Sequence, residues 1–118
     1  FAIIGGLTAI HQFCCIGTYS MLGGCCKVEK DIPPYLIGDG NPAVIRSINK
    51  VGLERAGFTT EQISRVKFAY RVLYREGLNR SQGLEKMREH AEAKEPEIQN
   101  FLTFAEKSER GFAPGLRN

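Results

Sequence analysis

Few side chains in this sequence are suited to acid–base chemistry, and the first of them is a histidine in an uncharged stretch. The chain has 118 residues and two histidines, and residues 1–26 contain no Asp, Glu, Lys or Arg. Histidine exchanges a proton near neutral pH, which makes His11 a candidate for catalysis. It stands where neighbouring six-residue repeats carry glycine, so its ring is expected to point outward, with Gln12 beside it. A structural histidine that is satisfied by local hydrogen bonds is the other interpretation, and both stay open.

Basic side chains form the second candidate site. Lys67, Arg71 and Arg75 are spaced four residues apart, which places them on one face of a helix. Such a stripe is either a solvated face or a landing surface that attracts an acidic partner by electrostatic steering. Arg55, near the end of the preceding predicted helix, and Asn49, about a turn and a half before it, are further polar candidates.

The overall charge and the absence of familiar motifs argue against several classes of protein. The chain has 16 Lys and Arg against 13 Asp and Glu, and this net charge of +3 is too small to indicate nucleic acid binding. The excess comes entirely from residues 46–80, where eight basic residues face three acids, while the parts before and after are each net −1. The sequence contains no GxGxxG, Walker or HExxH motif, which argues against a dehydrogenase, an NTPase or a zinc hydrolase. Glycines, His11 and Gln12 interrupt the uncharged opening, so we expect no membrane span. A signal peptide is not expected either, because no basic region precedes an apolar core.

The opening stretch repeats every six residues, which is typical of a parallel β-helix. Three hexads make one triangular coil, so each residue should lie on the residue 18 positions later, Ile4 on Leu22 and Ile10 on Val28. Glycine after three of the aliphatic residues is expected to supply the turn conformation. Because fewer than two coils bury no continuous core, we expect further coils before Phe1 and interpret the chain as the C-terminal end of a longer protein. The inward aliphatic series is Ile4, Ile10, Ile16, Leu22 and Val28. Two residues before each of them lies a small residue: Ala2, Thr8, Cys14, Ser20 and Cys26.

The four cysteines come as two adjacent pairs, Cys14 with Cys15 and Cys25 with Cys26. This spacing differs from the C-x-x-C that is typical of zinc sites. In the register of the hexads Cys14 and Cys26 point inward, whereas Cys15 and Cys25 do not. The favoured interpretation is that the inward pair fills the interior as small apolar residues, and no metal site is expected. Free thiols suit a reducing cytosol.

Behind the repeat the sequence predicts helices. The pair Pro33 and Pro34 should end the regular pairing, because proline lacks a ladder donor. A first helix is expected from Pro42 to about Ala56, with Asn41 as its N-cap. Three more are predicted from capping residues and glycine stops: one from the TTEQ capping box at 59–62 to Gly77, one opened by Asn79 or Ser81, and one from Pro96 to Gly111.

Two strings of residues, TAIHQF at 8–13 and NKVGLERAGF at 49–58, closely resemble the acyl-carrier-protein-dependent UDP-N-acetylglucosamine O-acyltransferases of lipid A biosynthesis. The similarity runs over nearly the whole chain and includes the DIPPY exit from the repeat. It implies an α+β fold, in which the last coils of a left-handed parallel β-helix at 1–37 are followed by a C-terminal α-helical bundle at 38–118. It also implies a homotrimer with active sites in clefts between subunits.

The resemblance further implies a cytoplasmic reaction that uses neither a metal nor an organic cofactor. An (R)-3-hydroxyacyl group passes from acyl carrier protein to the 3-hydroxyl of UDP-N-acetylglucosamine, which is the first step of lipid A biosynthesis. A histidine acts as general base, and its position would lie upstream of Phe1. His11 matches a family histidine in the cleft that supports activity. Gln12, Asn49 and Arg55 match positions that contact the sugar nucleotide or its acylated product.

For the carrier protein, the resemblance assigns Lys67 to a basic docking position, and we infer that Arg71 and Arg75 extend it. Two alternatives stay open. One is a non-catalytic module for trimerisation and carrier docking. The other is the related N-acyltransferase, which acts later on the pathway and acylates an amine. The sequence departs from the family at Pro42, Val51 and Ala56, where some members have histidine, an acidic residue and arginine.

Overall fold

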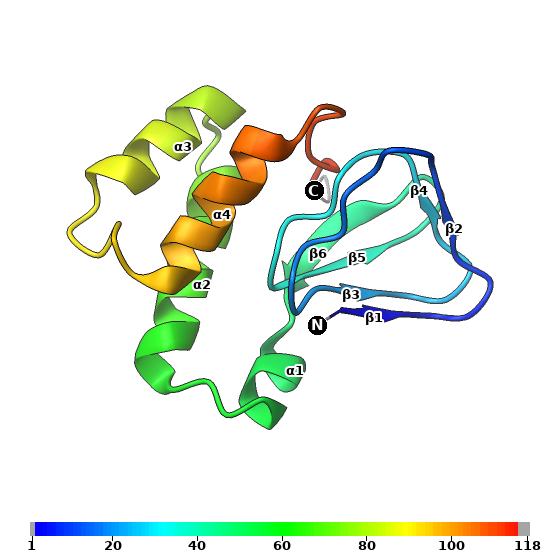
Figure 1. The fold of residues 1–118 in the computed structure, drawn as a ribbon, viewed down its shortest axis with the longest axis horizontal. Coiled ribbons are helices and arrows are strands. Elements are labelled where there is room, and N and C mark those ends of the chain that lie inside the picture. The colour runs from blue at the N-terminus through cyan, green and yellow to red at the C-terminus, as the bar shows by residue number, and fades with distance from the viewer. Residues whose placement is uncertain (1, 116–118) are drawn as a thin grey trace.

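The computed structural model describes residues 2–115, in which a strand-rich part and a helical part form a mixed α/β structure (Figure 1). Six strands and four helices lie within these residues, and none of the four is long and apolar enough to cross a membrane. The strands are β1 (Ile3–Ile4), β2 (Ala9–Ile10), β3 (Met21–Leu22), β4 (Lys27–Val28), β5 (Leu36–Asp39) and β6 (Val44–Ile48). The helices are α1 (Lys50–Arg55), α2 (Thr60–Tyr74), α3 (Arg80–Glu89) and α4 (Pro96–Lys107).

Strands β1 to β4 form the parallel pairing that the six-residue repeat predicts. β1 pairs with β3 and β2 pairs with β4, each at an offset of 18 residues. The predicted contacts of Ile4 with Leu22 and of Ile10 with Val28 are confirmed as Cα partners. The backbone N of Gly5 donates to the carbonyl of Leu22 at 2.9 Å, so the layers are joined by ladder hydrogen bonds. Leu22 and Val28 are fully buried, whereas Ile4 and Ile10 are 50% and 39% exposed.

The glycines of the repeat do not have the role that we expected. Among Gly5, Gly17 and Gly23 none has a positive φ, so they do not supply the turn conformation. A Cβ on Gly17 would lie 2.3 Å from the backbone N of Pro34, and a Cβ on Gly5 would lie 2.6 Å from that of Gly24. Glycine is therefore needed where two layers of backbone approach closely. The left-handed turn positions are instead Leu7, Phe13, Tyr19 and Cys25, six residues apart, with φ between 54° and 68°.

The predicted helix from Pro42 to Ala56 is wrong in its first half. Strand β6 runs antiparallel to β5 there. Helix α1 begins only at Lys50, and Asn49 is its N-cap instead of Asn41. Three of the five residues of β6 (VIRSI) are valine or isoleucine, whose branched side chains favour strands. The pattern of apolar residues was compatible with either element, and pairing with β5 decides for the strand.

Strand β5 continues the sheet beyond the proline pair. It pairs in parallel with β3, where Ile37 and Met21 are Cα partners, so the prolines do not end the regular pairing. Pairing resumes because Pro33 and Pro34 lie in the segment before the strand and need donate no ladder hydrogen bond. β5 also runs across residues 37 and 38, and the division of the chain into 1–37 and 38–118 stays a prediction.

The predicted starts of the helices are confirmed by their caps. Thr59 caps α2 in a capping box with Gln62, whose backbone N donates to the Thr59 hydroxyl at 3.2 Å. Helix α3 begins after Asn79, whose Oδ1 accepts from the backbone N of Gln82 at 2.8 Å. This contact decides between the two candidate caps, Asn79 and Ser81.

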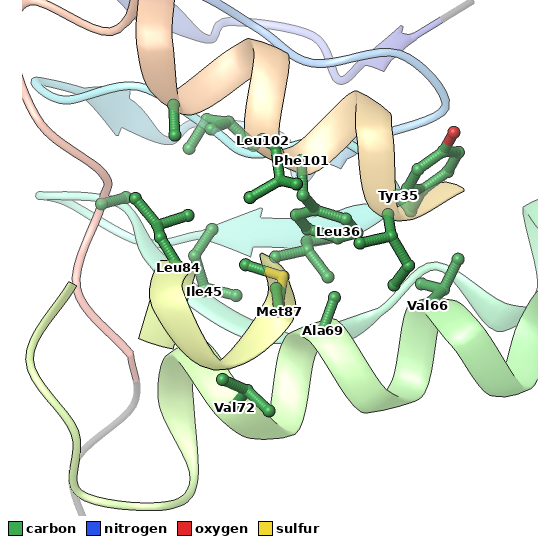
Figure 2. Packing of buried hydrophobic residues seen from close by; sticks show 14 of the residues in the cluster. Tyr35, Leu36, Ile45, Val66, Ala69, Val72, Leu84, Met87, Phe101 and Leu102 are labelled. Atoms are coloured by element: carbon green, nitrogen blue, oxygen red, sulfur yellow. The ribbon is translucent and has the colours of Figure 1, made fainter. Parts of the chain in front are cut away.

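Helix α4 connects the helical part to the strands. It has Pro96 at its first position and ends at Lys107, before the predicted stop at Gly111. Phe101 in its middle is fully buried, and its ring centroid lies 5.6 Å from that of Tyr35, directly before β5. Figure 2 shows both rings among buried side chains from α2, α3 and β5. The strands and the helices therefore share one apolar core.

Candidate functional site

A groove of about 760 Å³ lies between helix α1 and strands β1, β3 and β5. Its floor is apolar, because Ile3, Met21 and Ile37 are Cα partners in adjacent strands and lie side by side. Asn49 and Arg55 line the opposite wall, so the structure brings these two predicted site residues together. Figure 1 shows α1 beside the ends of β1 and β3. An apolar surface next to a few polar groups is the usual make-up of a ligand pocket.

Asn49 fixes the position of α1 on the strands. It is only 5% exposed, and its Nδ2 donates to the carbonyl of Tyr19 at 2.9 Å. Its Oδ1 accepts from the backbone N of Gly52 at 3.3 Å, which caps the helix. A Cβ on Gly52 would lie 2.4 Å from Asn49 Nδ2, so glycine is required at this point. The Asn49 amide is already used on both sides and acts first as a structural anchor for the groove wall.

The charged side chains of the groove are all cationic within the described part of the chain. Lys50 and Arg55 both belong to α1 and are exposed. The Nζ of Lys50 lies 4.0 Å from the Oε1 of Glu54, and Glu54 does not line the groove. Val51 and Ala56, two of the positions where the sequence departs from the resembled family, also line the groove, and Val51 is 60% exposed. The wall therefore suits an anionic ligand over an apolar floor.

His11 and Gln12 lie apart from this groove. Both are exposed on the turn after β2, which pairs with β4 in a separate two-stranded sheet. The Nδ1 of His11 lies 2.9 Å from the carbonyl of Gln12, and the backbone N of His11 donates to Val28. The expectation that the histidine ring points outward is confirmed. Within one chain, however, the structure does not bring these residues together with Asn49 and Arg55.

The basic stripe is exposed on the side of α2. Lys67 and Arg71 belong to the helix, and Arg75 is its C-cap, one residue beyond the last turn. The guanidinium carbon of Arg71 lies 5.6 Å from the centroid of the Phe68 ring. Its Nε donates to Glu76 at 3.2 Å. The stripe is therefore partly neutralised by a carboxylate of the same chain.

Two residues beside the stripe were missed by sequence reasoning. Glu76 follows α2, and its second carboxylate oxygen accepts from the Nζ of Lys86 on α3 at 2.5 Å. The Lys86 ammonium, and after it Arg71, hold the pKa of Glu76 below its ordinary value, so this carboxylate is ionised at neutral pH. Lys86 lies ten residues after Glu76, and helical spacing gives no signal for contact over the intervening turn.

The cysteines are free thiols arranged as the repeat predicts. Cys26 is buried and Cys14 half-buried, whereas Cys15 and Cys25 are exposed. Burial raises the pKa of the Cys14 thiol, which keeps it protonated. Across residues 2–115 no three His, Cys, Asp or Glu side chains gather closely enough to hold a metal ion.

The chain matches the family described as UDP-N-acetylglucosamine O-acyltransferase, domain 2, over residues 31–113. Curated relatives named acyl-(acyl-carrier-protein)–UDP-N-acetylglucosamine O-acyltransferase include the proteins of Thiobacillus denitrificans, 43% identical over 111 residues, and Burkholderia orbicola, 44% identical over 114 residues. Each match covers 94% of this chain but only 43% and 44% of these relatives. The chain therefore spans less than half the length of the curated relatives it matches.

Solved structures of UDP-N-acetylglucosamine acyltransferases also resemble the chain. LpxA from Acinetobacter baumannii and LpxA from Bacteroides fragilis each align with a TM-score of 0.89, at 37% and 42% identity. The alignments cover 95% and 98% of this chain, and 43% and 44% of the two structures. The likeness thus extends over the strands and the helices. On the family match, the relatives and this shared architecture, the chain belongs to the UDP-N-acetylglucosamine O-acyltransferase family.

Proposed function

We propose that the chain is the C-terminal part of an acyltransferase that acylates the 3-hydroxyl of UDP-N-acetylglucosamine. The donor would be an (R)-3-hydroxyacyl group on acyl carrier protein, in the first step of lipid A biosynthesis. The observation that carries this proposal is the groove, in which Arg55 and the anchored Asn49 face an apolar floor. The cationic wall suits the diphosphate of the nucleotide, and the floor suits apolar parts of the substrates.

The chemistry assigned to this chain is binding and orientation. In the transfer, the sugar hydroxyl attacks the thioester carbonyl, an ester bond forms, and the carbon–sulfur bond to the carrier breaks. The base that takes the hydroxyl proton is proposed to lie upstream of Phe1, as the resemblance implies. Arg55 would hold the diphosphate, because guanidinium groups bind phosphate through paired hydrogen bonds. No metal or organic cofactor is part of this proposal.

The assembly that we propose is a homotrimer in the cytoplasm. The 18-residue offset of the parallel strands supports the last coils of a left-handed β-helix, capped by a helical bundle. His11 and Gln12 follow strand β2, which belongs to a different sheet from the strands of the groove, and this separation supports a site that is completed between subunits. In this arrangement His11 supports catalysis and Gln12 contacts the substrate. Lys67, Arg71 and Arg75 would dock the acidic carrier protein.

Replacing Arg55 in the full-length enzyme tests the proposed function. Arg55→Ala should raise the KM for UDP-N-acetylglucosamine about ten- to a hundredfold, since a charge-assisted hydrogen bond to phosphate is lost. Arg88→Ala is the matched control, because this exposed arginine on α3 pairs with Glu85 at 3.4 Å and does not line the groove. Unchanged kcat and KM for Arg55→Ala would contradict the proposal. Mild alkaline cleavage of the product distinguishes the expected ester from the amide of an N-acyltransferase.

A further inference from the structure

Glu76 is a bridge between two cations on different helices. Its carboxylate accepts from Arg71 of α2 at 3.2 Å and from Lys86 of α3 at 2.5 Å, one cation on each oxygen. Arg71 and Lys86 are more than half exposed, at 56% and 51% of their side chains, whereas Glu76 is 25% exposed. The two basic heads therefore belong to one solvent-facing surface, and the carboxylate lies between them.

This bridge is not needed to hold α2 and α3 together. The two helices pack closely without it, because a Cβ on Gly83 would lie 3.3 Å from the carbonyl of Val72. Leu84 and Met87 of α3 are buried in the shared core, as Figure 2 shows. Exposed ion pairs contribute little to folding stability, since both partners are well solvated when apart. The position of Glu76 calls for another explanation than helix packing.

Charge complementarity supplies that explanation. Lys67, Arg71 and Arg75 present a basic stripe on the side of α2, and Lys86 adds a fourth cation from α3. An acidic protein that approaches this surface brings carboxylates that can replace Glu76 at both cations. Since the exposed pairs are weak, the exchange costs little, but the resident negative charge reduces the attraction that the partner experiences.

We propose that the docking surface for an acidic partner extends from α2 onto α3 through Lys86, and that Glu76 limits its affinity by competing for Arg71 and Lys86. The partner is an acidic protein with a cluster of carboxylates. Its identification as the acyl carrier protein rests on the proposed function. Glu76 then sets a moderate affinity, so that the partner can leave after each encounter.

Binding titrations on the full-length protein test this proposal with two ligands, acyl carrier protein and a polyglutamate peptide, at low and at physiological salt. Glu76→Gln should tighten binding of both about three- to tenfold at low salt, and Lys86→Gln should weaken it by a similar factor. Both effects should shrink at higher salt, where charges are screened. In the Glu76→Gln background, Lys86→Gln should cost more than in the wild type, because Lys86 is then unmasked. Glu106→Gln, which neutralises an exposed carboxylate on α4, is the matched control and should leave both affinities unchanged.

The outcomes separate this proposal from the proposed function. Binding of the peptide but not of the carrier protein would show that the carrier protein is not the partner. The effects of the variants on peptide binding would still test the docking surface. Equal dissociation constants for the wild type, Glu76→Gln and Lys86→Gln with both ligands would overturn the proposal, as would a wild type that binds neither. A lower Tm for Glu76→Gln with unchanged affinities would also overturn it, because the bridge would then only join the helices.

Discussion

The parallel strands β1 to β4 and the helices α2 to α4 bury their atoms in different ways. The strands are two residues long each and are joined by backbone hydrogen bonds between layers, with glycine where two layers nearly touch. The helices bury large side chains such as Phe101 and Met87 between them. The strand region should therefore be damaged most by added atoms, and the helical region by removed ones. Four predictions test this difference.

The largest effect is expected from removing a side chain between the helices. Phe101→Ala deletes a fully buried ring and should lower the free energy of unfolding by about 4 kcal/mol, through lost burial and the cavity that remains. Phe101→Leu leaves a smaller cavity and should cost less than half as much. Denaturant unfolding of both variants measures the difference. Equal losses for the two variants would show that cavity size does not govern this region.

A slightly smaller effect is expected from adding one methyl group between the strand layers. Gly17→Ala places a Cβ 2.3 Å from the backbone N of Pro34, and backbone cannot rotate away, so a loss of about 3 kcal/mol is expected. Gly6→Ala is the matched control in the same repeat, because a Cβ there meets nothing within 4 Å. Thermal unfolding should therefore separate the two variants clearly. Similar Tm values for both would mean that the layers are not closely packed at Gly17.

The third effect concerns a helix terminus, where a local signal acts without burial. Asn79→Ala removes the side chain that caps α3 and should cost about 1 kcal/mol. Ser81→Ala, two residues further on, removes a hydroxyl that does not cap the helix and should be nearly neutral. Denaturant unfolding of the pair checks the assignment. A larger loss for Ser81→Ala would place the start of α3 at the other candidate cap.

The contrast between the two regions also explains what the sequence could predict. Helix starts depend on contacts within a few residues, so Thr59, Asn79 and Pro96 mark the starts of α2, α3 and α4 in the sequence itself. The 18-residue offset of the strands follows from periodicity and was predictable for the same reason. The conformation of each turn could not be predicted, because Tyr19 and Cys25 adopt a left-handed backbone conformation that their residue types disfavour.

The errors and omissions lie where distant segments decide. Residues 44–48 form a strand because β5 is available for pairing, and a segment with helical spacing gives no sign of that partner. The groove was foreseeable only in part. Asn49 and Arg55 could be selected from the sequence, but the apolar floor from β1, β3 and β5 depends on the register of the sheet. The bridge from Glu76 to Lys86 has no local pattern at all.

The smallest effect should appear at Tyr35, where the two regions meet. Its ring centroid lies 6.3 Å from that of Tyr19 in the strand region and 5.6 Å from that of Phe101 in α4. Burial raises the pKa of the Tyr35 hydroxyl above the ordinary 10.0, which the amide of Asn100 offsets only in part by donating a hydrogen bond to the hydroxyl oxygen. The unfolded chain therefore releases this proton at a lower pH than the folded chain.

The sign of the pH dependence follows from this difference. The stability contributed by the protonated hydroxyl is fully present below pH 10 and is lost as the pH rises above that value. Tyr35→Phe has no phenolic proton to lose, so the free energy of unfolding of the wild type should fall relative to that of the variant as the pH rises above 10.0. Denaturant unfolding across this range measures the difference. If the difference in free energy of unfolding between the wild type and Tyr35→Phe stayed constant with pH, the hydroxyl would be solvated in the folded chain. Water would then reach this ring between the strands and the helices.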